Sequence, residues 1–344
     1  MTNAQPPVPE IGQGNFPRAL GDAGSCVLVT MPEPLALLDG ALPGGVAGVV
    51  FARGTELETL ERLARELPSA DLVAGFGGGT ACDTAKFLAW KWGARLVLAP
   101  SIISVDAWLC RSIAVRDQGR VRYIGDVTPE RIIVDTDLVR RAPAVLIRAG
   151  VADAISICSA LGDWLIARDE FGERFDQCVF DSARRIARDL MRHARAIRNV
   201  TPDGIAAMVR ALRDQVLLCE AWGNARPEEG SEHFLAYCLE NITRAHYIHG
   251  NLIALNVLTV LRLQRERAVF SVEEMKGFFD AAGLAYRPSH QGIARRDYEQ
   301  ALLTAPDFVR RENLFKGLWW RERVFDDTGP LSAQGVADWL YGLE

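Results

Sequence analysis

Short apolar runs alternate with amphipathic stretches in the first part of the chain. The β-branched and apolar runs are typical of buried strands and lie at residues 26–30, 48–51, 72–75, 95–99 and 132–134. Between them, 56–67 places Leu57, Leu60 and Leu63 on one helical face, and 80–93 is also predicted as a helix. Strands that alternate with helices at this spacing predict a mainly parallel sheet with helices on its faces.

The pattern changes near Arg141. From there on, apolar residues recur with a helical period and strand-like runs nearly vanish. The predicted helices lie at 151–167, 175–197, 204–222, 233–243 and 249–266. We therefore predict an α/β N-terminal domain over 1–143, followed by an all-α C-terminal domain over 144–344.

Composition narrows the class of protein. The 344 residues are 49% hydrophobic and 24% charged, with a net charge of −5, which gives no reason to expect nucleic acid or a membrane as partner. The arginine-rich segment 184–198 is interleaved with aspartates and is typical of a solvated helix face. The seven cysteines form no C-x-x-C motif and no leader-like or membrane-spanning segment is seen, so we expect reduced thiols and a cytoplasmic protein.

A glycine-rich turn is the first candidate for chemistry. Gly77, Gly78 and Gly79 follow a predicted strand and precede a predicted helix, where free N–H groups and the helix dipole favour a phosphate. Thr80 is placed to cap that helix, with Asp83 at capping-box spacing. The spacing matches neither G-x-G-x-x-G nor the Walker loop, and a tight turn that only packs helix on sheet stays open as an alternative.

Histidines supply the second candidate. His233 and His249 each stand near the start of a predicted helix, and Asp153 is acidic in an apolar helical segment. Two imidazoles and a carboxylate would form a three-ligand site with an open position for Zn²⁺ or Fe²⁺. His246 and His249 form a competing pair at i and i+3, and Asp153 could instead be a first-turn residue favoured by the helix dipole.

Taken together, these motifs resemble a known superfamily. G-G-G-T-A-C-D-T-A-K, P-S-I-I-S-V-D-A, I-V-D-T-D-L-V, A-G-V-A-D-A-I-S, G-S-E-H and I-H-G occur in the order and spacing of the iron-containing alcohol dehydrogenases, glycerol dehydrogenases and dehydroquinate synthases. The resemblance covers about residues 20–265. Within the superfamily, A-R-P-E-E-G-S-E-H looks most like the sn-glycerol-1-phosphate dehydrogenases. It implies a dehydroquinate synthase-like fold with an N-terminal nucleotide-binding domain.

The resemblance implies a function and a set of site residues. It implies NAD- or NADP-linked reduction of a small, phosphorylated ketone such as dihydroxyacetone phosphate, with one divalent metal and with homo-oligomers common among relatives. Asp153, His233 and His249 match the metal ligands. The cofactor positions matched are Gly77, Gly78, Gly79, Ser101 and Ser104, joined by Thr80 and Asp83 from the turn itself.

Three further positions match residues near the substrate. Asp106 matches an acidic residue at the polyol end. Arg226 stands where phosphate-handling relatives also carry Arg, although a surface ion pair with Glu228 or Glu229 is an equal alternative. Tyr237 replaces a second histidine that is usual in this branch, and is a poorer proton relay at neutral pH but still a hydrogen-bond donor.

Two alternatives remain open. Asn251, in place of a common Glu, and Tyr237 leave room for a divergent non-catalytic member. A dehydroquinate synthase-like cyclase, which uses NAD transiently, relies on several lysines around its substrate, whereas only Lys86 and Lys91 precede Lys276 here. The lysine count therefore favours the dehydrogenase.

Overall fold

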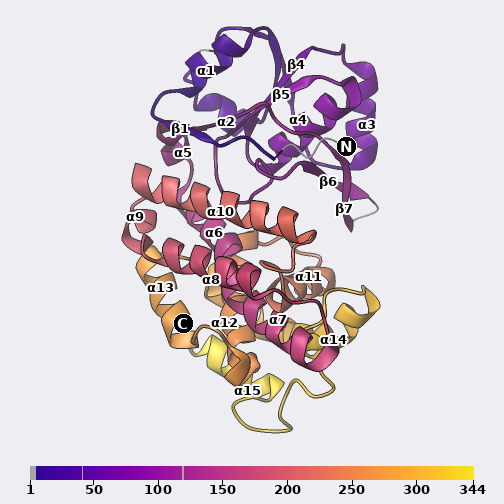
Figure 1. Ribbon diagram of the computed structural model, residues 1–344, viewed down its shortest axis with the longest axis vertical. Helices are drawn as coiled ribbons and strands as arrows, with labels where there is room; N and C mark the ends of the chain where they lie inside the picture. Colours follow the sequence, from indigo (N-terminus) through magenta and orange to yellow (C-terminus); the bar gives the residue numbers. More distant parts are fainter. Residues whose placement is uncertain (1–4, 41, 118–119) are drawn as a thin grey trace. The chain divides into compact units, whose positions relative to one another are not determined.

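The computed structural model describes residues 5–40, 42–117 and 120–344. The chain divides into two compact units, Met1–Ile147 and Arg148–Glu344 (Figure 1).

The first unit is built on a six-stranded sheet in which every described strand pair is parallel. The strand order is β1-β8-β5-β4-β2-β3. The strands are β1 Glu10–Gly12, β2 Cys26–Thr30, β3 Val46–Phe51, β4 Leu72–Gly77, β5 Arg95–Pro100 and β8 Arg131–Asp135. The chain moves outward in opposite directions from β2 and from β4. The carboxyl ends of these two neighbours are therefore a topological switch point, where open α/β sheets bind ligands.

Helices cover the sheet, as the sequence predicted. They are α1 Phe16–Ala23, α2 Pro32–Ala36, α3 Leu57–Glu66, α4 Gly79–Trp92 and α5 Thr136–Arg141. One apolar core joins α1 to the sheet, with Phe16 stacked on Phe76 at 4.5 Å between ring centroids. A hairpin that the pattern did not predict, β6 Ser112–Asp117 and β7 Arg120–Asp126, packs Ile113 and Val115 against α3 and α4.

The second unit is helical. Residues 148–344, all of them described, contain α-helices and short 3-10 turns but no strand. The helices are α6 Ala144–Ile155, α7 Ile157–Phe171, α8 Gln177–Met191, α9 Ala194–Arg198, α10 Pro202–Trp222, α11 Ser231–Thr243, α12 His249–Gln264, α13 Val272–Ala282, α14 Arg295–Arg311 and α15 Ala333–Tyr341. The predicted order of an α/β region followed by an all-α region is confirmed.

Two predicted helices differ in their limits. The segment expected at 175–197 is two helices, because α8 ends at Met191 and α9 begins at Ala194. The segment expected at 151–167 is divided between α6 and α7. The stretch 144–171 is also long and apolar enough to cross a membrane, but 78% of its most apolar window is buried within the protein. Core helices of globular proteins meet the same criterion.

Candidate functional site

The glycine turn lies where β4 passes into α4. Gly78 is the N-cap of α4 and no side chain caps this end, so the first-turn N–H groups lack side-chain partners. A Cβ on Gly77 would lie 2.6 Å from the Cβ of Ala81, which explains why glycine allows this close approach of helix to strand. The predicted cap at Thr80 is wrong, because Thr80 already lies inside α4. An uncapped helix N-terminus at the switch point can bind an anion.

Asp83 does not complete a capping box, and the structure corrects that prediction. Its carboxylate is 5% exposed, forms an ion pair with Lys86 at 2.7 Å and accepts a hydrogen bond from the backbone N–H of Ala114 at 3.2 Å. Burial raises the pKa of Asp83, against the opposing charge of Lys86. Lys86, 1% exposed, also donates to the carbonyl oxygens of Cys110 and Ser112 at 3.2 and 2.7 Å. The pair therefore fixes the hairpin to α4.

The segment 101–110 follows β5, the neighbour of β4. Gly77 and Pro100 are paired in register, and the N–H of Ser101 donates to the carbonyl of Gly77 at 3.0 Å. The buried Ser101 is therefore beside the glycine turn, and the half-buried Ser104 follows on the same segment. Asp106, also half-buried, accepts a hydrogen bond from the Cys110 thiol at 3.1 Å. All of these residues belong to the first unit.

Asp153, His233 and His249 come together in the second unit. They lie on α6, α11 and at the start of α12, and one ligand atom from each lies within 4.8 Å of the others. Asp153 Oδ1 is 3.3 Å from His249 Nε2 and 4.0 Å from His233 Nε2. Tetrahedral ligands about 2.1 Å from a metal are about 3.4 Å apart, so the spacing suits a divalent cation.

The chemistry of this group also fits a cation. Asp153 Oδ1 is buried and has no hydrogen-bond partner, although an unpaired buried carboxylate oxygen is costly. His249 keeps 35% of its side chain exposed, against 11% for His233. His246, which competes with His233 as a partner of His249 in the sequence, lies outside the cluster. Among the described residues, Asp153, His233 and His249 are the one group of three or more potential metal ligands. The three side chains could therefore hold a metal with one side open.

A single glycine brings His249 to Asp153. Gly250, next to His249 on α12, lies against the backbone of α6, and a Cβ there would be 1.9 Å from the carbonyl oxygen of Ala149. Only glycine permits this approach. The His-Gly pair of the sequence is thus one structural element, in which the glycine provides the contact and the histidine provides the ligand.

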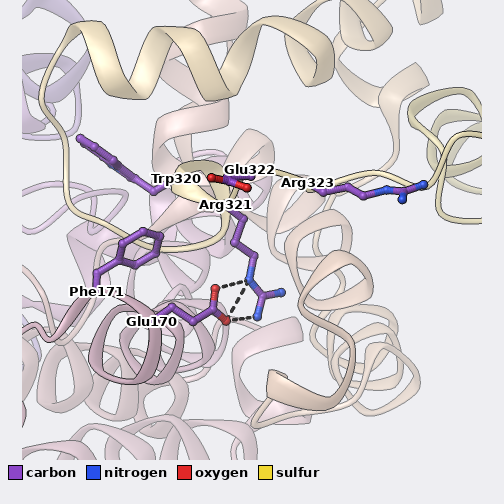
Figure 2. A pocket seen from close by; sticks show the side chains of 6 residues that line it. All are labelled: Glu170, Phe171, Trp320, Arg321, Glu322 and Arg323. Carbon is purple, nitrogen blue, oxygen red and sulfur yellow. Dashed lines mark hydrogen bonds and ion pairs between the residues drawn. The ribbon is translucent and has the colours of Figure 1, made fainter.

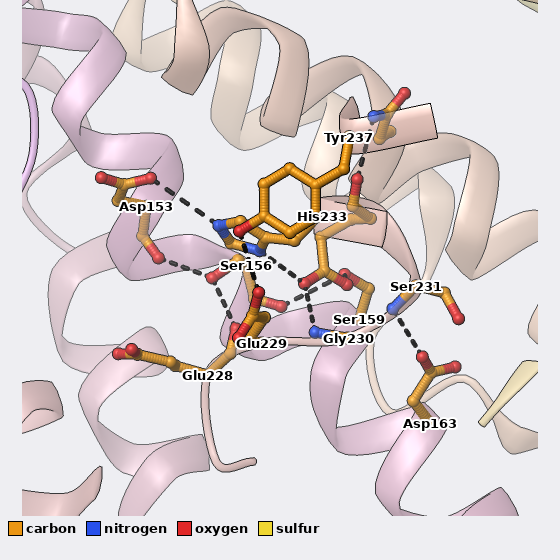
Figure 3. Close-up of polar contacts among 12 residues, drawn as sticks. Asp153, Ser156, Ser159, Asp163, Glu228, Glu229, Gly230, Ser231, His233 and Tyr237 are labelled. Atoms are coloured by element: carbon orange, nitrogen blue, oxygen red, sulfur yellow. Dashed lines mark hydrogen bonds and ion pairs between the residues drawn. The ribbon is translucent and has the colours of Figure 1, made fainter. Parts of the chain in front are cut away.

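His233 lies between two carboxylates (Figure 3). Its Nδ1 is 3.0 Å from Oε1 of Glu232, while its Nε2 faces Asp153. Burial alone would lower the pKa of His233, but the hydrogen bond to Glu232 and the charges of Glu232, Glu229 and Asp153 outweigh it and raise the pKa to about 9. The imidazole therefore sits in a strongly negative environment, as expected for a cation site.

Tyr237 is one turn beyond His233 on α11. The two ring centroids are 6.1 Å apart, and the Tyr237 hydroxyl donates to Glu229 Oε1 at 2.9 Å. Its side chain stays 36% exposed. Asn251, two residues after His249, is buried, and its Oδ1 has no hydrogen-bond partner. Both departures from the family pattern thus lie on the ligand-bearing helices.

Arg226 differs from one of its two sequence interpretations, the surface ion pair. Its side chain has no exposed surface, so it forms no surface ion pair, and its carboxylate neighbour is Glu173 at 3.3 Å. Burial lowers the pKa of Arg226, while the charges of Glu173 and Asp163 oppose that shift. None of its guanidinium nitrogens makes a hydrogen bond. Arg226 is thus an interior cation of the helical unit, and its contact with a substrate phosphate stays a prediction.

The sequence pattern missed the buried polar groups beneath the histidines. Glu232, Ser156, Ser159 and Asp163 are all fully buried and all form hydrogen bonds around the N-terminal end of α11. Three of them recur at 156, 159 and 163, a helical spacing within an otherwise apolar stretch. Polar residues that recur with a helical period in an apolar segment are the sequence signal that could have indicated this buried hydrogen-bond network.

A surface cavity of about 430 Å³ lies elsewhere on the helical unit (Figure 2). It is lined by Glu170, Phe171, Trp320, Arg321, Glu322 and Arg323. Arg321 is paired with Glu170, and Arg323 with Asp327. None of the candidate metal ligands lines this cavity.

Comparisons with known proteins agree with the motifs. Residues 45–143 match the family model for iron-containing alcohol dehydrogenase. A glycerol-1-phosphate dehydrogenase [NAD(P)+] of Hyperthermus butylicus is 32% identical over 215 residues, which are 62% of this chain and 61% of that protein. The chain thus aligns with less than two thirds of that relative's length.

Solved structures show the same fold over nearly the whole chain. Glycerol dehydrogenase from Schizosaccharomyces pombe has a TM-score of 0.71 at 17% identity, with 98% of this chain and 89% of that chain covered. Sulfoacetaldehyde reductase from Bifidobacterium kashiwanohense, solved with NAD+, has a TM-score of 0.70 at 15% identity, with 100% and 99% covered. The resemblance to the iron-containing alcohol dehydrogenase and glycerol dehydrogenase superfamily is confirmed in sequence and in fold.

Proposed function

We propose that this chain is a metal-containing, NAD(P)-dependent dehydrogenase that reduces a small phosphorylated ketone, with dihydroxyacetone phosphate as the first candidate. The observation that carries the proposal is the convergence of Asp153, His233 and His249 from three helices. Similarity to glycerol-1-phosphate dehydrogenases supports the choice of substrate. The seven free cysteines support a reducing, cytoplasmic location.

The residues of the second unit would hold the metal. Asp153 supplies an anionic oxygen, and His233 and His249 supply Nε2, a donor set that suits Zn²⁺ and Fe²⁺ alike. When bound, the metal supplies Lewis acidity for a ketone oxygen and the nicotinamide supplies the hydride. Tyr237 is 36% exposed, and its hydroxyl, oriented by Glu229, can hydrogen-bond to a substrate hydroxyl beside His233.

The residues of the first unit would bind the dinucleotide. The uncapped N-terminus of α4 offers N–H groups and the positive end of a helix dipole to a pyrophosphate. Ser101 and Ser104, on the segment beside that turn, are proposed to line the nicotinamide side. Asp106, on the same segment, is proposed to contact the polyol end of the substrate.

Elemental analysis and a coupled activity assay test the proposal. Zn and Fe would be measured in wild type, His233→Ala and His246→Ala, with NAD(P)H oxidation by dihydroxyacetone phosphate followed on the same samples. His246 is the matched control, because it is exposed and lies three residues from His249 but outside the cluster. We expect about one metal per chain in wild type and the control, and loss of metal and activity together in His233→Ala. Full activity of the metal-free protein would refute the proposal.

A further inference from the structure

Glu232 is a fully buried carboxylate in contact with a proposed metal ligand. It lies in the first turn of α11, directly before His233, and has no exposed surface. Its Oε1 is 3.0 Å from Nδ1 of His233. A buried carboxylate needs compensating partners, so its other contacts decide what it does.

Two donors fix the Glu232 carboxylate independently of the histidine. The backbone N–H of Gly230 donates to Oε1 at 2.7 Å, and the Ser159 hydroxyl on α7 donates to Oε2 at 2.8 Å. The amide of Asn256 on α12 also donates to the Glu232 carbonyl oxygen at 2.9 Å. Glu232 is therefore held by three helices before any metal binds.

This arrangement determines the proton on His233. Glu232 Oε1 is already an acceptor for Gly230, so the neighbouring Nδ1 of His233 must carry the hydrogen and donate. Nε2 is then the ring nitrogen left to a metal, and it faces Asp153 Oδ1, which has no hydrogen-bond partner, while Nε2 of His249 approaches the same oxygen. A carboxylate oxygen that faces two imidazole nitrogens in this way favours a positive charge between them.

We propose that Glu232 is a positioning residue that holds His233 as its Nδ1–H tautomer and thereby sets the affinity of the cluster for a divalent metal. The inference rests on the metal site of the proposed function and adds a residue to it. Carboxylates that hydrogen-bond to a metal-ligating imidazole orient the ring and raise its basicity, and their loss typically costs about 10- to 100-fold in metal affinity.

Asp163 provides a matched control. It is also a fully buried carboxylate in the same region, but its oxygens accept hydrogen bonds from the backbone of Ser231 and Leu318 and from Gln264, and no contact with His233 is seen. Asp163→Asn therefore perturbs the packing around α11 without touching the imidazole.

The test measures metal binding rather than turnover. Zn²⁺ affinity of the full chain would be measured by competition with a chromogenic chelator in wild type, Glu232→Ala, Glu232→Gln and Asp163→Asn. Ring ¹⁵N shifts of the histidines would be recorded in the zinc-loaded samples to assign the tautomer. Far-UV circular dichroism would establish that each variant is folded, and Glu232→Gln, which keeps the shape and one acceptor oxygen, covers the case in which the alanine variant does not fold.

The expected result is a graded loss of affinity. Glu232→Ala should bind Zn²⁺ about 10- to 100-fold more weakly, Glu232→Gln by less, and Asp163→Asn within about threefold of wild type. His233 should show a protonated Nδ1 in wild type and a mixed or altered tautomer in the Glu232 variants. Wild-type affinity and an unchanged tautomer in the folded Glu232 variants would overturn this inference alone, as would an equal loss in Asp163→Asn. Failure of the wild type to bind Zn²⁺ would overturn the proposed function with it.

Discussion

The Gly250→Ala substitution places one methyl group at the closest contact between α12 and α6. The new Cβ would lie 1.9 Å from the carbonyl oxygen of Ala149 and 2.5 Å from its carbon. Carbon–oxygen contacts in proteins are about 3.3 Å or longer, so the start of α12 must move by about 1.4 Å, which is 3.3 minus 1.9. The obstacle is backbone, which cannot rotate away as a flexible side chain could.

That displacement has two separate costs. Overpacking of this kind lowers the free energy of unfolding by about 1–3 kcal/mol. His249 directly precedes Gly250 and moves with it, whereas metal–ligand distances tolerate only about 0.2 Å. We therefore expect metal affinity to fall by more than about 100-fold, beyond the loss of an outer hydrogen-bond partner.

Metal affinity and stability are measured on the same variants, by chelator competition and urea unfolding. Gly277→Ala on α13 is the control, because a Cβ there meets nothing within 4 Å and should raise stability by about 0.5–1 kcal/mol. Wild-type metal affinity in Gly250→Ala would refute the argument that this contact positions His249.

Three further perturbations test other parts of the molecule. Lys86→Met leaves the buried Asp83 without its ion-pair partner, so the free energy of unfolding of the first unit should fall by about 3–5 kcal/mol, as measured by hydrogen exchange on α4 and β6. Adding Asp83→Leu should restore part of this stability, and equal losses in the single and double variants would contradict the reasoning. The hydrogen bond from Arg131 lowers the pKa of Glu10 from 4.5. Because the pair is largely exposed, it should stabilise the folded chain by about 0.2–1 kcal/mol. This stabilisation is present above pH 4.5 and is lost as the pH falls through the lowered pKa. Urea unfolding of wild type and Glu10→Gln should therefore differ at pH 7 and converge in acid, and a gap that stays constant with pH would exclude the effect. Bound metal at 100 times its Kd stabilises by about 2.7 kcal/mol, so a chelator should lower the melting temperature of wild type but not of His249→Ala, and an equal drop in both would count against the metal site.

The sheet could largely be predicted from the sequence, because its central strands are buried on both faces. Continuous apolar runs such as β4, buried at all six positions, stand out from their surroundings. β1 could not be found, since Glu10–Gly12 is a short edge strand with no apolar run and depends on its partner β8. The hairpin carries alternating apolar positions at Ile113 and Val115, a weaker signal than a continuous apolar run.

The candidate site was predictable in its ligands but not in their surroundings. Aspartate and histidine are uncommon inside an apolar helical core, so Asp153, His233 and His249 stand out in the sequence as candidate metal ligands. The contacts of Arg226 and Asp83 could not be predicted, because they depend on the positions of Glu173 and Lys86 in the folded chain. The same holds for Glu232, whose role follows only from its contacts with Ser159 and His233.

The distribution of the three ligands along the chain has a consequence for synthesis. All three belong to the second unit, and the last ligand follows the first by 249 minus 153, or 96, positions. At about 5–20 residues per second, a ribosome takes about 5–20 s to cover that distance. The first unit, whose β1 can pair as soon as β8 emerges, is thus free to fold before the third ligand exists. On a nascent chain, metal capture must therefore be a late event, after the α/β unit has been made.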